Sequence, residues 1–359
     1  MKILTIIQCS NLGGMEQATL ESLSLLKGEG HDIELFSLHP AGELKPLSDE
    51  RGIPLSGTEK YRFMGIGNIL DILREIKRTR PDRIWLIGHN VGTLLAVRMI
   101  RCPAFLSIHY HHAERAMRFW RLFYAIARSS VRRIHFVSHY IYHEVEGLFG
   151  PKDDTVCFPN VFPEPQGLMG RADARAQLGI SPNAYVVGNA GWLIKRKAFD
   201  VFLDTAALIK QKIPSAVFLI AGDGEEHEAL RAQADRLGLG DAVIFLGWQR
   251  DLLPFYSSLD LLLFNSNFDA LGRTPVEAMT FGIPVVASVL HGGLNEFIRH
   301  GVDGFLIDQH DPALLADEVL KLFESPDYKQ RMVASGWNRV KDVGSPERHL
   351  KQLNNFLEL

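Results

Sequence analysis

The sequence FDALGRTPVEAMTFGIPVVAS, residues 268–288, follows an apolar run that ends in LLLFNSN. Its segment Thr274-Pro275-Val276-Glu277 has the pattern of a capping box, with Thr at the N-cap, Pro at the first helical position and Glu at the third. One interpretation of Glu277 is therefore that it caps a helix. The other is functional, because the amides and the positive dipole end of a helix that follows Gly272 can bind a diphosphate. Asp269, eight positions before Glu277, is expected on the loop that leads into this helix.

Short apolar runs alternate with amphipathic segments along the whole chain, which is typical of an α/β protein with a parallel sheet between helices. The expected strands are 2–7, 33–38, 83–87, 104–108 and 134–137 in the first half, and 185–188, 217–220, 243–246, 260–264, 284–287 and 304–307 in the second. Helices such as 16–27 and 69–78 lie between them.

The segment 158–166, FPNVFPEPQ, contains three prolines and is expected to be an extended connector, with a hinge turn at Asn160. The sequence therefore predicts two facing Rossmann-like domains, residues 1–160 and 161–344. A C-terminal helix at about 345–359 can pack back on the first domain. We expect the ligand cleft where the carboxyl ends of the two sheets meet.

The composition excludes several classes of protein. The 359 residues are 46% hydrophobic and 23% charged, which is typical of a globular chain with room for two domains. The apolar runs are far shorter than the roughly 20 residues of a membrane-spanning helix, and the start MKILTIIQCS lacks a signal-peptide pattern, so we expect a cytoplasmic protein. Cys9, Cys102 and Cys157 are widely spaced and suggest neither disulfides nor a zinc site. The net charge of −3 does not indicate nucleic-acid binding.

The segment quoted first resembles the acidic-x7-acidic motif of the family 4 retaining glycosyltransferases, whose two-domain fold is named GT-B. The resemblance implies that Asp269 binds hydroxyls of the donor sugar and that Glu277 binds the ribose. It also implies that the backbone between them, at Gly272, Arg273 and Thr274, holds the diphosphate. The family usually has Glu at both ends of the motif. Asp269 is one methylene shorter, which leaves the identity of the sugar open.

Three glycine-containing stretches match the family on the donor side. The sequence GWLIKRK, 191–197, resembles a segment in which an Arg and a Lys neutralise the leaving diphosphate. Lys197 matches the Lys, Trp192 stands in the place of the Arg, and Lys195 or Arg196 can supply the missing charge. The sequences AGDGE, 221–225, and GWQ, 247–249, resemble loops that frame the nucleotide base, and they assign donor-binding roles to Gly222, Trp248 and Gln249.

Two further matches lie in the first domain. The sequence NLGGME, 11–16, follows the first strand and is similar to the family's glycine-rich first loop. The resemblance implies that Gly13 and Gly14 let the backbone approach phosphate and that Glu16 lies on the acceptor side. His109, expected at the end of the fourth strand, resembles a histidine beside the donor sugar.

These matches imply a retaining, metal-independent hexosyltransferase without a cofactor. The donor would be a nucleoside diphosphate sugar bound by the second domain, and the acceptor a glycan or lipid-linked molecule bound by the first. The product would be cell-surface polysaccharide or lipopolysaccharide. Cations and amide dipoles at the leaving phosphate would stabilise the transition state. The sequence contains no Asp-x-Asp motif for magnesium, and His109, His111, His112 and Glu114 form an alternative, less favoured metal site.

Two other classes of protein remain as alternatives. An NAD-dependent oxidoreductase requires a GxGxxG turn and an acidic residue about 20 positions later, and residues 11–16 lack that spacing. A catalytically weak nucleotide-sugar-binding protein would be consistent with the changes at Trp192 and Asp269. It would bind the donor and form no product.

A basic amphipathic helix is expected over residues 118–132. On a helical wheel one face carries Phe119, Leu122, Phe123 and Ile126, with Ala127 and Trp120 at its margin, and another side carries Arg118, Arg121, Arg128 and Arg132. In one interpretation the apolar face packs on the sheet and the arginines are solvated. In the other, Trp120, Tyr124 and the arginines, Arg118 and Arg121 among them, contact an anionic membrane or a phosphorylated lipid acceptor. The second interpretation predicts peripheral binding to the inner face of the cell membrane.

Overall fold

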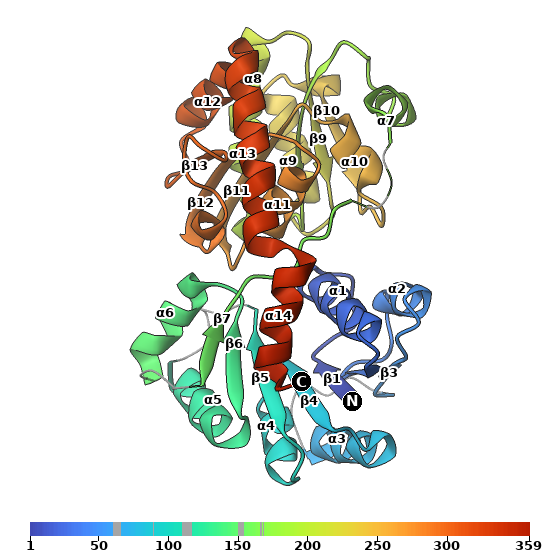
Figure 1. The fold of residues 1–359 in the computed structure, drawn as a ribbon. Helices are drawn as coiled ribbons and strands as arrows, with labels where there is room; N and C mark the ends of the chain where they lie inside the picture. The colour runs from blue at the N-terminus through green and yellow to red at the C-terminus, as the bar shows by residue number, and fades with distance from the viewer. Residues whose placement is uncertain (60–65, 89, 110–116, 150–153, 166, 168) are drawn as a thin grey trace. The chain divides into compact units, whose positions relative to one another are not determined.

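The computed structural model describes residues 1–59, 66–88, 90–109, 117–149, 154–165, 167 and 169–359 (Figure 1). The chain divides into two compact units. Unit 1 comprises Met1–Val161 and Gly344–Leu359, and unit 2 comprises Phe162–Val343. Three members of the alternative metal site, His111, His112 and Glu114, lie outside the described residues.

In unit 1 the described strands form a seven-stranded parallel sheet in the order β3-β2-β1-β4-β5-β6-β7. The strands are β1 (Lys2–Ile7), β2 (Asp32–Ser37), β3 (Leu55–Gly57), β4 (Arg83–Ile87), β5 (Ala104–Ile108), β6 (Arg133–Phe136) and β7 (Thr155–Cys157). Strand β5 is buried along its whole length, as expected for a parallel strand covered on both faces. The strand order reverses between β1 and β4.

The helices of unit 1 cover both faces of this sheet. They are α1 (Gly14–Gly28), α2 (Leu44–Glu50), α3 (Ile66–Thr79), α4 (Val91–Arg98), α5 (Met117–Ser130), α6 (His139–Phe149) and α14 (Pro346–Leu357). Helix α1 packs against α2 and α14, whereas α3, α4, α5 and α6 pack side by side in chain order. Because parallel crossovers are right-handed and the strand order reverses at β1, these two groups lie on opposite faces of the sheet.

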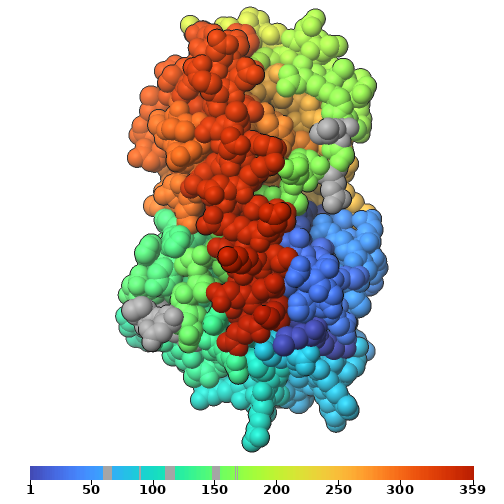
Figure 2. All heavy atoms as spheres, in the orientation of Figure 1, coloured from blue at the N-terminus to red at the C-terminus, as the bar shows by residue number. Residues whose placement is uncertain are grey.

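The C-terminal helix α14 belongs to unit 1 and lies at its surface, red in Figure 2. Ser345 caps it by accepting from the Arg348 amide at 3.4 Å, and Pro346 starts it. His349 anchors it to α1, with its Nε2 2.9 Å from the Ser22 hydroxyl. At its other end the Phe356 ring packs edge-on against Phe105 in the sheet.

In unit 2 the described strands form a six-stranded parallel sheet in the order β10-β9-β8-β11-β12-β13. The strands are β8 (Tyr185–Ala190), β9 (Ala216–Ala221), β10 (Val243–Gly247), β11 (Leu261–Asp269), β12 (Val285–Gly292) and β13 (Phe305–Ile307). The helices are α7 (Arg171–Gln177), α8 (Phe199–Lys212), α9 (His227–Arg236), α10 (Leu253–Ser258), α11 (Arg273–Thr280), α12 (Pro312–Glu324) and α13 (Pro326–Gly344). Single 3₁₀ turns are η1 (Lys195–Lys197), η2 (Gly240–Ala242) and η3 (Leu294–Glu296). Apolar side chains on both faces of the sheet, such as Phe218 and Phe264, are buried in the core.

Three local predictions are corrected by these elements. Strands β3 and β7 were not predicted, so His109 follows the fifth strand rather than the fourth. Strand β11 extends to Asp269, which pairs with Gly292 of β12, so Asp269 ends a strand instead of lying on a loop. The capping box was wrong: Gly272 is the N-cap of α11, with φ 79°, and the side chain of Thr274 makes no cap. The Thr274 hydroxyl donates instead to the carbonyl of Ala190 at 3.1 Å.

The buried face of α5 also differs from the helical wheel. The side chains that pack inward are Trp120, Phe123, Tyr124 and Ala127, whereas Leu122 is exposed. The side chains that pack on the sheet are mainly large aromatic residues, and the ring of Trp120 contacts those of Phe123 and Tyr124. Trp120 and Tyr124 therefore cannot contact a membrane, and that part of the prediction was wrong. Among the described helices, none is long and apolar enough to cross a bilayer.

Candidate functional site

The sheet of unit 2 reverses its strand order between β8 and β11. Ligands of open α/β sheets bind outside the carboxyl ends of the strands at such a point. Here these ends are Ala190 and Asp269. The chain then continues into η1 after β8, and into α11 after β11. The two segments singled out from the sequence, GWLIKRK and the acidic motif, therefore begin at neighbouring strand ends.

Lys197 and Asp269 form an ion pair at this position. The other oxygen of the carboxylate, Oδ1, accepts from the Gly272 amide at 3.0 Å. Burial acts to raise the pKa of Asp269, but the Lys197 ammonium, the Gly272 amide and the charge of Arg196 together lower it below its ordinary value. The carboxylate is thus ionised at neutral pH and fixed beside a lysine ammonium, whose remaining donors can bind a further anion.

The η1 turn that carries Lys197 is held by polar residues at the end of β11. The Asn267 amide donates to the Lys195 carbonyl at 3.1 Å, and the Ser266 hydroxyl lies 3.2 Å from the Arg196 carbonyl. The oxygen of Asn267 lies 3.0 Å from Nε2 of His310. Since that oxygen can only accept, His310 carries a proton on Nε2. Sequence reasoning missed Asn267 and His310, although the polar run NSN at a strand end was a signal for the first.

The two candidates for the missing positive charge differ in their surroundings. Lys195 is exposed, and its Nζ lies 2.7 Å from Oε2 of Glu226. Arg196 is also exposed, and its charge contributes to the lowered pKa of Asp269. Of the two, Arg196 is the cation whose field reaches the Lys197–Asp269 pair.

Glu277 lies one turn into α11 and has two side-chain partners. Its Oε1 lies 2.5 Å from Nε of Arg273, and its Oε2 accepts from the Tyr256 hydroxyl at 2.7 Å. Burial and the neighbouring carboxylate raise the pKa of Tyr256 well above its ordinary value, so Tyr256 remains a donor. Tyr256 comes from α10, and no sequence motif pointed to it.

Three loops meet at the carboxyl ends of β8, β9 and β10. The Gly222 amide donates to the Gly247 carbonyl at 2.8 Å, and a Cβ at Gly222 would lie 1.9 Å from the Gly191 carbonyl oxygen. Only glycine allows this approach. Next to it the rings of Trp192 and Trp248 lie 4.5 Å apart, and Trp192 is 42% exposed. Trp192 thus forms an aromatic surface with Trp248 in the place of a cation. The Gln249 side chain turns back and donates to the Leu246 carbonyl at 2.6 Å.

In unit 1 the glycine-rich loop opens α1, with Gly13 as N-cap and Gly14 as the first helical residue. The carboxylate of Glu16 folds back over this end of the helix, because its Oε2 lies 2.5 Å from where a Cβ of Gly13 would be. Its Oε1 accepts from the thiol of Cys9 at 3.2 Å, and burial raises the pKa of Glu16. Glu16 is buried at the start of α1.

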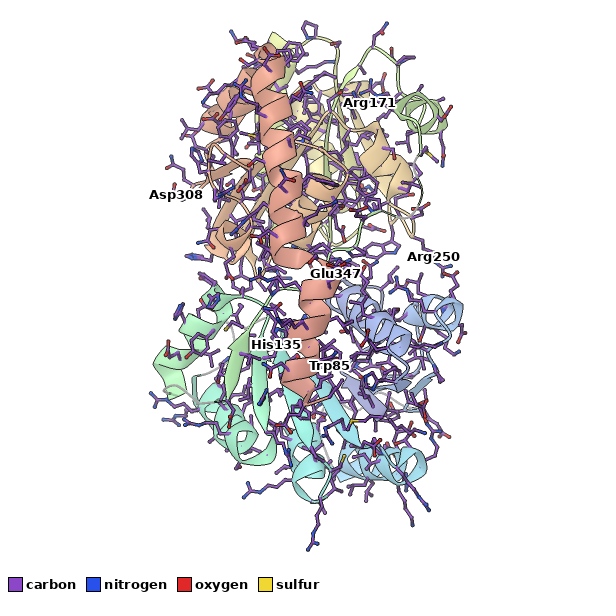
Figure 3. The ribbon with its side chains drawn as sticks, viewed as in Figure 1. Trp85, His135, Arg171, Arg250, Asp308 and Glu347 are labelled. Atoms are coloured by element: carbon purple, nitrogen blue, oxygen red, sulfur yellow. The ribbon has the colours of Figure 1, made fainter. Side chains whose placement is uncertain are left out.

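His109 follows β5 directly and is buried. Burial, with a smaller contribution from His349, lowers the pKa of His109 to about 3, so its ring is neutral at physiological pH. The Nε2 atom of His109 has no hydrogen-bond partner among the described residues. Its ring lies 6.4 Å from that of His135. The side chains of His135 and Trp85, which are labelled in Figure 3, share the Ser107 hydroxyl as a hydrogen-bond partner.

The described residues contain no group of three or more His, Cys, Asp or Glu side chains arranged to hold a metal ion. The structure thus brings together Lys197, Asp269, Gly272 and Thr274 at one point of unit 2, with Arg273 and Glu277 in the helix that begins there. The residues of unit 1 that the sequence assigned to the site lie at the start of α1 and after β5.

Comparisons with known proteins agree with this arrangement. The family model described as Glycosyltransferase Family 4 matches residues 12–162, and the model described as Glycosyl transferases group 1 matches residues 170–339. The lipopolysaccharide core biosynthesis glycosyltransferase LpsD of Rhizobium meliloti (strain 1021) is 33% identical over 165 residues, which are 45% of this chain and 46% of LpsD. The match thus spans about half the length of that relative.

Other relatives match along their whole length. The amylovoran biosynthesis glycosyltransferase AmsD of Erwinia amylovora is 24% identical over 371 residues, 99% of both chains. Crystal structures of Anabaena Alr3699/HepE, one with UDP and glucose and one with UDP-glucose, are 23% identical and cover 100% of this chain and 99% of theirs, with TM-scores of 0.88 and 0.87. The two family models follow each other along the chain and together match most of both units. The chain therefore belongs to glycosyltransferase family 4, and its two Rossmann-like sheets have the GT-B fold.

Proposed function

We propose that this glycosyltransferase transfers a hexose from a nucleoside diphosphate sugar, with retention of configuration, to a glycan or lipid-linked acceptor during synthesis of cell-surface polysaccharide or lipopolysaccharide. The observation that carries the proposal is the Lys197–Asp269 ion pair at the strand reversal of unit 2, beside the first turn of α11. Relatives named for lipopolysaccharide core and amylovoran biosynthesis support the product class. The UDP-glucose complex of HepE makes UDP-hexoses the first donors to test.

The donor would extend across the carboxyl ends of neighbouring strands of unit 2. Its base would lie near Trp248 and Gln249 after β10, with Gly222 after β9 allowing the backbone to approach. Its diphosphate would lie between Lys197, Arg196 and the amides of α11. These positions span the order β10-β9-β8-β11, and three strand spacings of about 4.8 Å give roughly 14 Å, which suits an extended nucleoside diphosphate.

The sugar and ribose would be bound by the two ends of the acidic motif. Asp269, ionised and fixed by Lys197 and the Gly272 amide, can accept hydrogen bonds from sugar hydroxyls. Glu277 can bind ribose hydroxyls if one of its carboxylate oxygens exchanges its present partner, Arg273 or Tyr256, for the ribose. In this proposal His109, which is neutral at physiological pH, contacts the donor sugar, and Glu16 acts on the acceptor side.

In the reaction the anomeric C–O bond to the phosphate breaks and its electron pair stays on the phosphate oxygen. The acceptor oxygen forms the new bond on the same face of the sugar, and its proton passes to the departing phosphate. Negative charge therefore grows at the phosphate, where Lys197, Arg196 and the helix amides stabilise it in place of water. No protein nucleophile is needed.

Trp192 supports a second candidate function. At this position a family 4 enzyme would use a cation, and a tryptophan packed against Trp248 brings no charge to the diphosphate. Weaker stabilisation of the leaving group would give a nucleotide-sugar-binding protein with little turnover.

One experiment separates the two functions. The protein is incubated with a panel of UDP-, GDP- and ADP-sugars, alone and with lipid-linked or polysaccharide acceptors, while donor binding and product are both measured. The transferase function predicts donor hydrolysis or a glycosylated product whose linkage has the donor's anomeric configuration. Saturable donor binding without product in any combination would support the binding protein and contradict the proposal.

A further inference from the structure

We propose that His310 is a positioning residue for the cationic turn η1, which it holds through Asn267 so that Lys197 stays directed at the leaving diphosphate. The role of Lys197 in this proposal rests on the proposed function, whereas the contacts that hold the turn all lie within unit 2. His310 comes from the segment between β13 and α12, outside the glycine-containing stretches and the acidic motif.

A chain of side-chain hydrogen bonds runs from β12 to η1. The Ser288 hydroxyl, which is buried on β12, bonds to Nδ1 of His310. On the other side of the ring, Nε2 donates to the side-chain oxygen of Asn267 at 3.0 Å. The amide nitrogen of Asn267 donates in turn to the Lys195 carbonyl at 3.1 Å. His310 thus connects a buried residue of the sheet to the backbone of the turn that carries Lys197.

His310 determines how the Asn267 side chain is oriented. A carboxamide can rotate by half a turn, which exchanges its oxygen and its nitrogen, and Asn267 is exposed to water. Only one orientation directs the nitrogen to the Lys195 carbonyl, and a fixed N–H donor at the oxygen selects that orientation. Burial lowers the pKa of His310, so the ring is neutral at physiological pH, with its proton on Nε2 and with Nδ1 accepting from Ser288.

The backbone of η1 ends in an unfavourable conformation. Ala198, which follows Lys197, has φ 46° and ψ 45°, in the left-handed region that residues with a Cβ avoid. Such a conformation persists where the surrounding contacts determine it. The Ala198 amide donates to the Lys195 carbonyl at 3.2 Å, and the Asn267 amide binds the same carbonyl. Asn267, oriented by His310, therefore stabilises the end of the turn that is strained.

A role in stability alone predicts a different result. Without the His310 ring, the Ser288 hydroxyl can still donate to the Gln309 carbonyl, which lies 3.0 Å away, and the exposed Asn267 can bind water. The exchange of an exposed hydrogen bond for one with water changes stability little. Loss of His310 should therefore change the position of Lys197 much more than the folding of unit 2.

The first test is the turnover of His310→Leu and His310→Gln with a nucleoside diphosphate sugar that the parent uses. His310→Leu should lower kcat by about 10–100-fold and change the donor KM less, because a small displacement of a catalytic charge has an effect of this size. The amide nitrogen of Gln can take the place of Nε2, so His310→Gln should keep most of the parent kcat. In a Lys197→Ala background, His310→Leu should have no further effect, since both act through one charge.

The second test measures the turn itself and does not need turnover. Hydrogen exchange, followed by mass spectrometry of a peptide that contains residues 195–198, should be at least about tenfold faster in His310→Leu, because local opening exposes the Ala198 amide. His310→Gln should exchange like the parent. The matched control is His300→Leu, at an exposed histidine of the same unit, which should change neither kcat nor this exchange. Thermal unfolding should show that all variants are folded.

Three results would overturn the proposal. The first is a folded His310→Leu protein with either the kcat or the η1 exchange rate of the parent. The second is a loss in His310→Gln as large as in His310→Leu, and the third is an equal effect of His310→Leu with and without Lys197. A parent that turns over no donor would instead contradict the proposed function, and exchange at η1 would still decide whether His310 holds the turn.

Discussion

Each oxygen of the Glu277 carboxylate has a different partner. One faces the Arg273 guanidinium and the other accepts from Tyr256, and Glu277 is not the third residue of a Thr-capped helix. The local sequence could not show this, because the conformation of Gly272 places the start of α11 two residues earlier than the motif suggests. The cap interpretation of Glu277 is wrong, and the ribose interpretation stays a prediction.

We predict that Glu277→Gln raises the donor KM while the fold is retained. Gln can still accept from Tyr256, but it loses the charge that orients Arg273 and that strengthens hydrogen bonds from a ribose. The loss of one partly exposed ion pair should lower the stability of unit 2 by about 1 kcal/mol. The measurement is donor kinetics together with thermal unfolding.

The control for this variant is Glu228→Gln, an exposed carboxylate on α9 of the same unit. It should change neither the donor KM nor the unfolding temperature. If Glu277→Gln lowers the unfolding temperature and leaves the donor KM unchanged, Glu277 is a structural residue only.

At the scale of elements, buried histidines connect the segment that follows β7 to the sheet and to α14 of unit 1. The His135 ring donates from Nε2 to the Phe158 carbonyl at 2.8 Å, and Nδ1 of His349 lies 3.0 Å from the Pro159 carbonyl. Burial lowers the pKa of all three rings, to about 3 in His109 and about 4 in His349. Each ring is therefore neutral in the folded state at a pH where it would be protonated in the unfolded chain.

We predict that unit 1 loses stability as the pH falls from 7 to 5. In this window the unfolded state, with histidine pKa values near 6.5, binds more protons than the folded state, so the free energy of unfolding decreases with decreasing pH. At pH 5 a histidine with a folded pKa of 3–4 contributes about 2 kcal/mol of this loss. Calorimetry across this pH range, with the proton uptake on unfolding, measures the effect.

Variants assign the effect to the buried rings. His349→Gln should flatten the pH dependence by about the share of one histidine, whereas His143→Gln, at an exposed position on α6, should leave it unchanged. The account is contradicted if the parent protein has the same unfolding temperature and enthalpy at pH 7 and pH 5.

Much of the fold follows from hydrophobic pattern. Every strand expected from the sequence is present, and its start differs from the expected one by one residue at most. The pattern failed for β3 and β7, because their sequences LSG and TVC mix apolar with small or polar residues, whereas the equally short β13 has the apolar sequence FLI. It also failed for the polar end of β11, which is a strand through its pairing with β12 and not through its composition.

The site could be predicted only where a motif carries it. Lys197, Asp269, Gly272 and Thr274 come together as the order of motifs implied. Tyr256, Asn267 and His310 were missed, because their roles arise from contacts between elements that the sequence does not place. The buried face of α5 was predicted incorrectly for the same reason, because packing on the sheet determines which side chains are buried and a helical wheel does not describe that packing.

At the scale of the whole molecule, the two sheets have similar topologies. In each of them the strand order reverses beside the strand that comes first in the chain, β1 or β8. The family match excludes the NAD-dependent alternative. In the proposed reaction the positive charge at the leaving diphosphate comes from unit 2 itself, from Lys197, Arg196 and the amides at the start of α11.

We therefore predict that donor turnover is unchanged in excess EDTA. The measurement is the rate of product formation after dialysis against the chelator, with and without added magnesium. Complete loss that magnesium restores would show that the charge at the phosphate comes from a metal ion.

The most direct measurement of the central claim is the turnover of Lys197→Ala beside that of Lys212→Ala, an exposed lysine at the end of α8. Loss of a preorganised charge at the leaving group costs about 2.7–4 kcal/mol in the transition state, so kcat should fall on the order of 10²–10³-fold while donor binding weakens far less. Circular dichroism and thermal unfolding establish that both variants are folded, and Lys212→Ala should match the parent. A folded Lys197→Ala enzyme with the kcat of the parent would contradict the assignment of Lys197 and, with it, the account of how this site works.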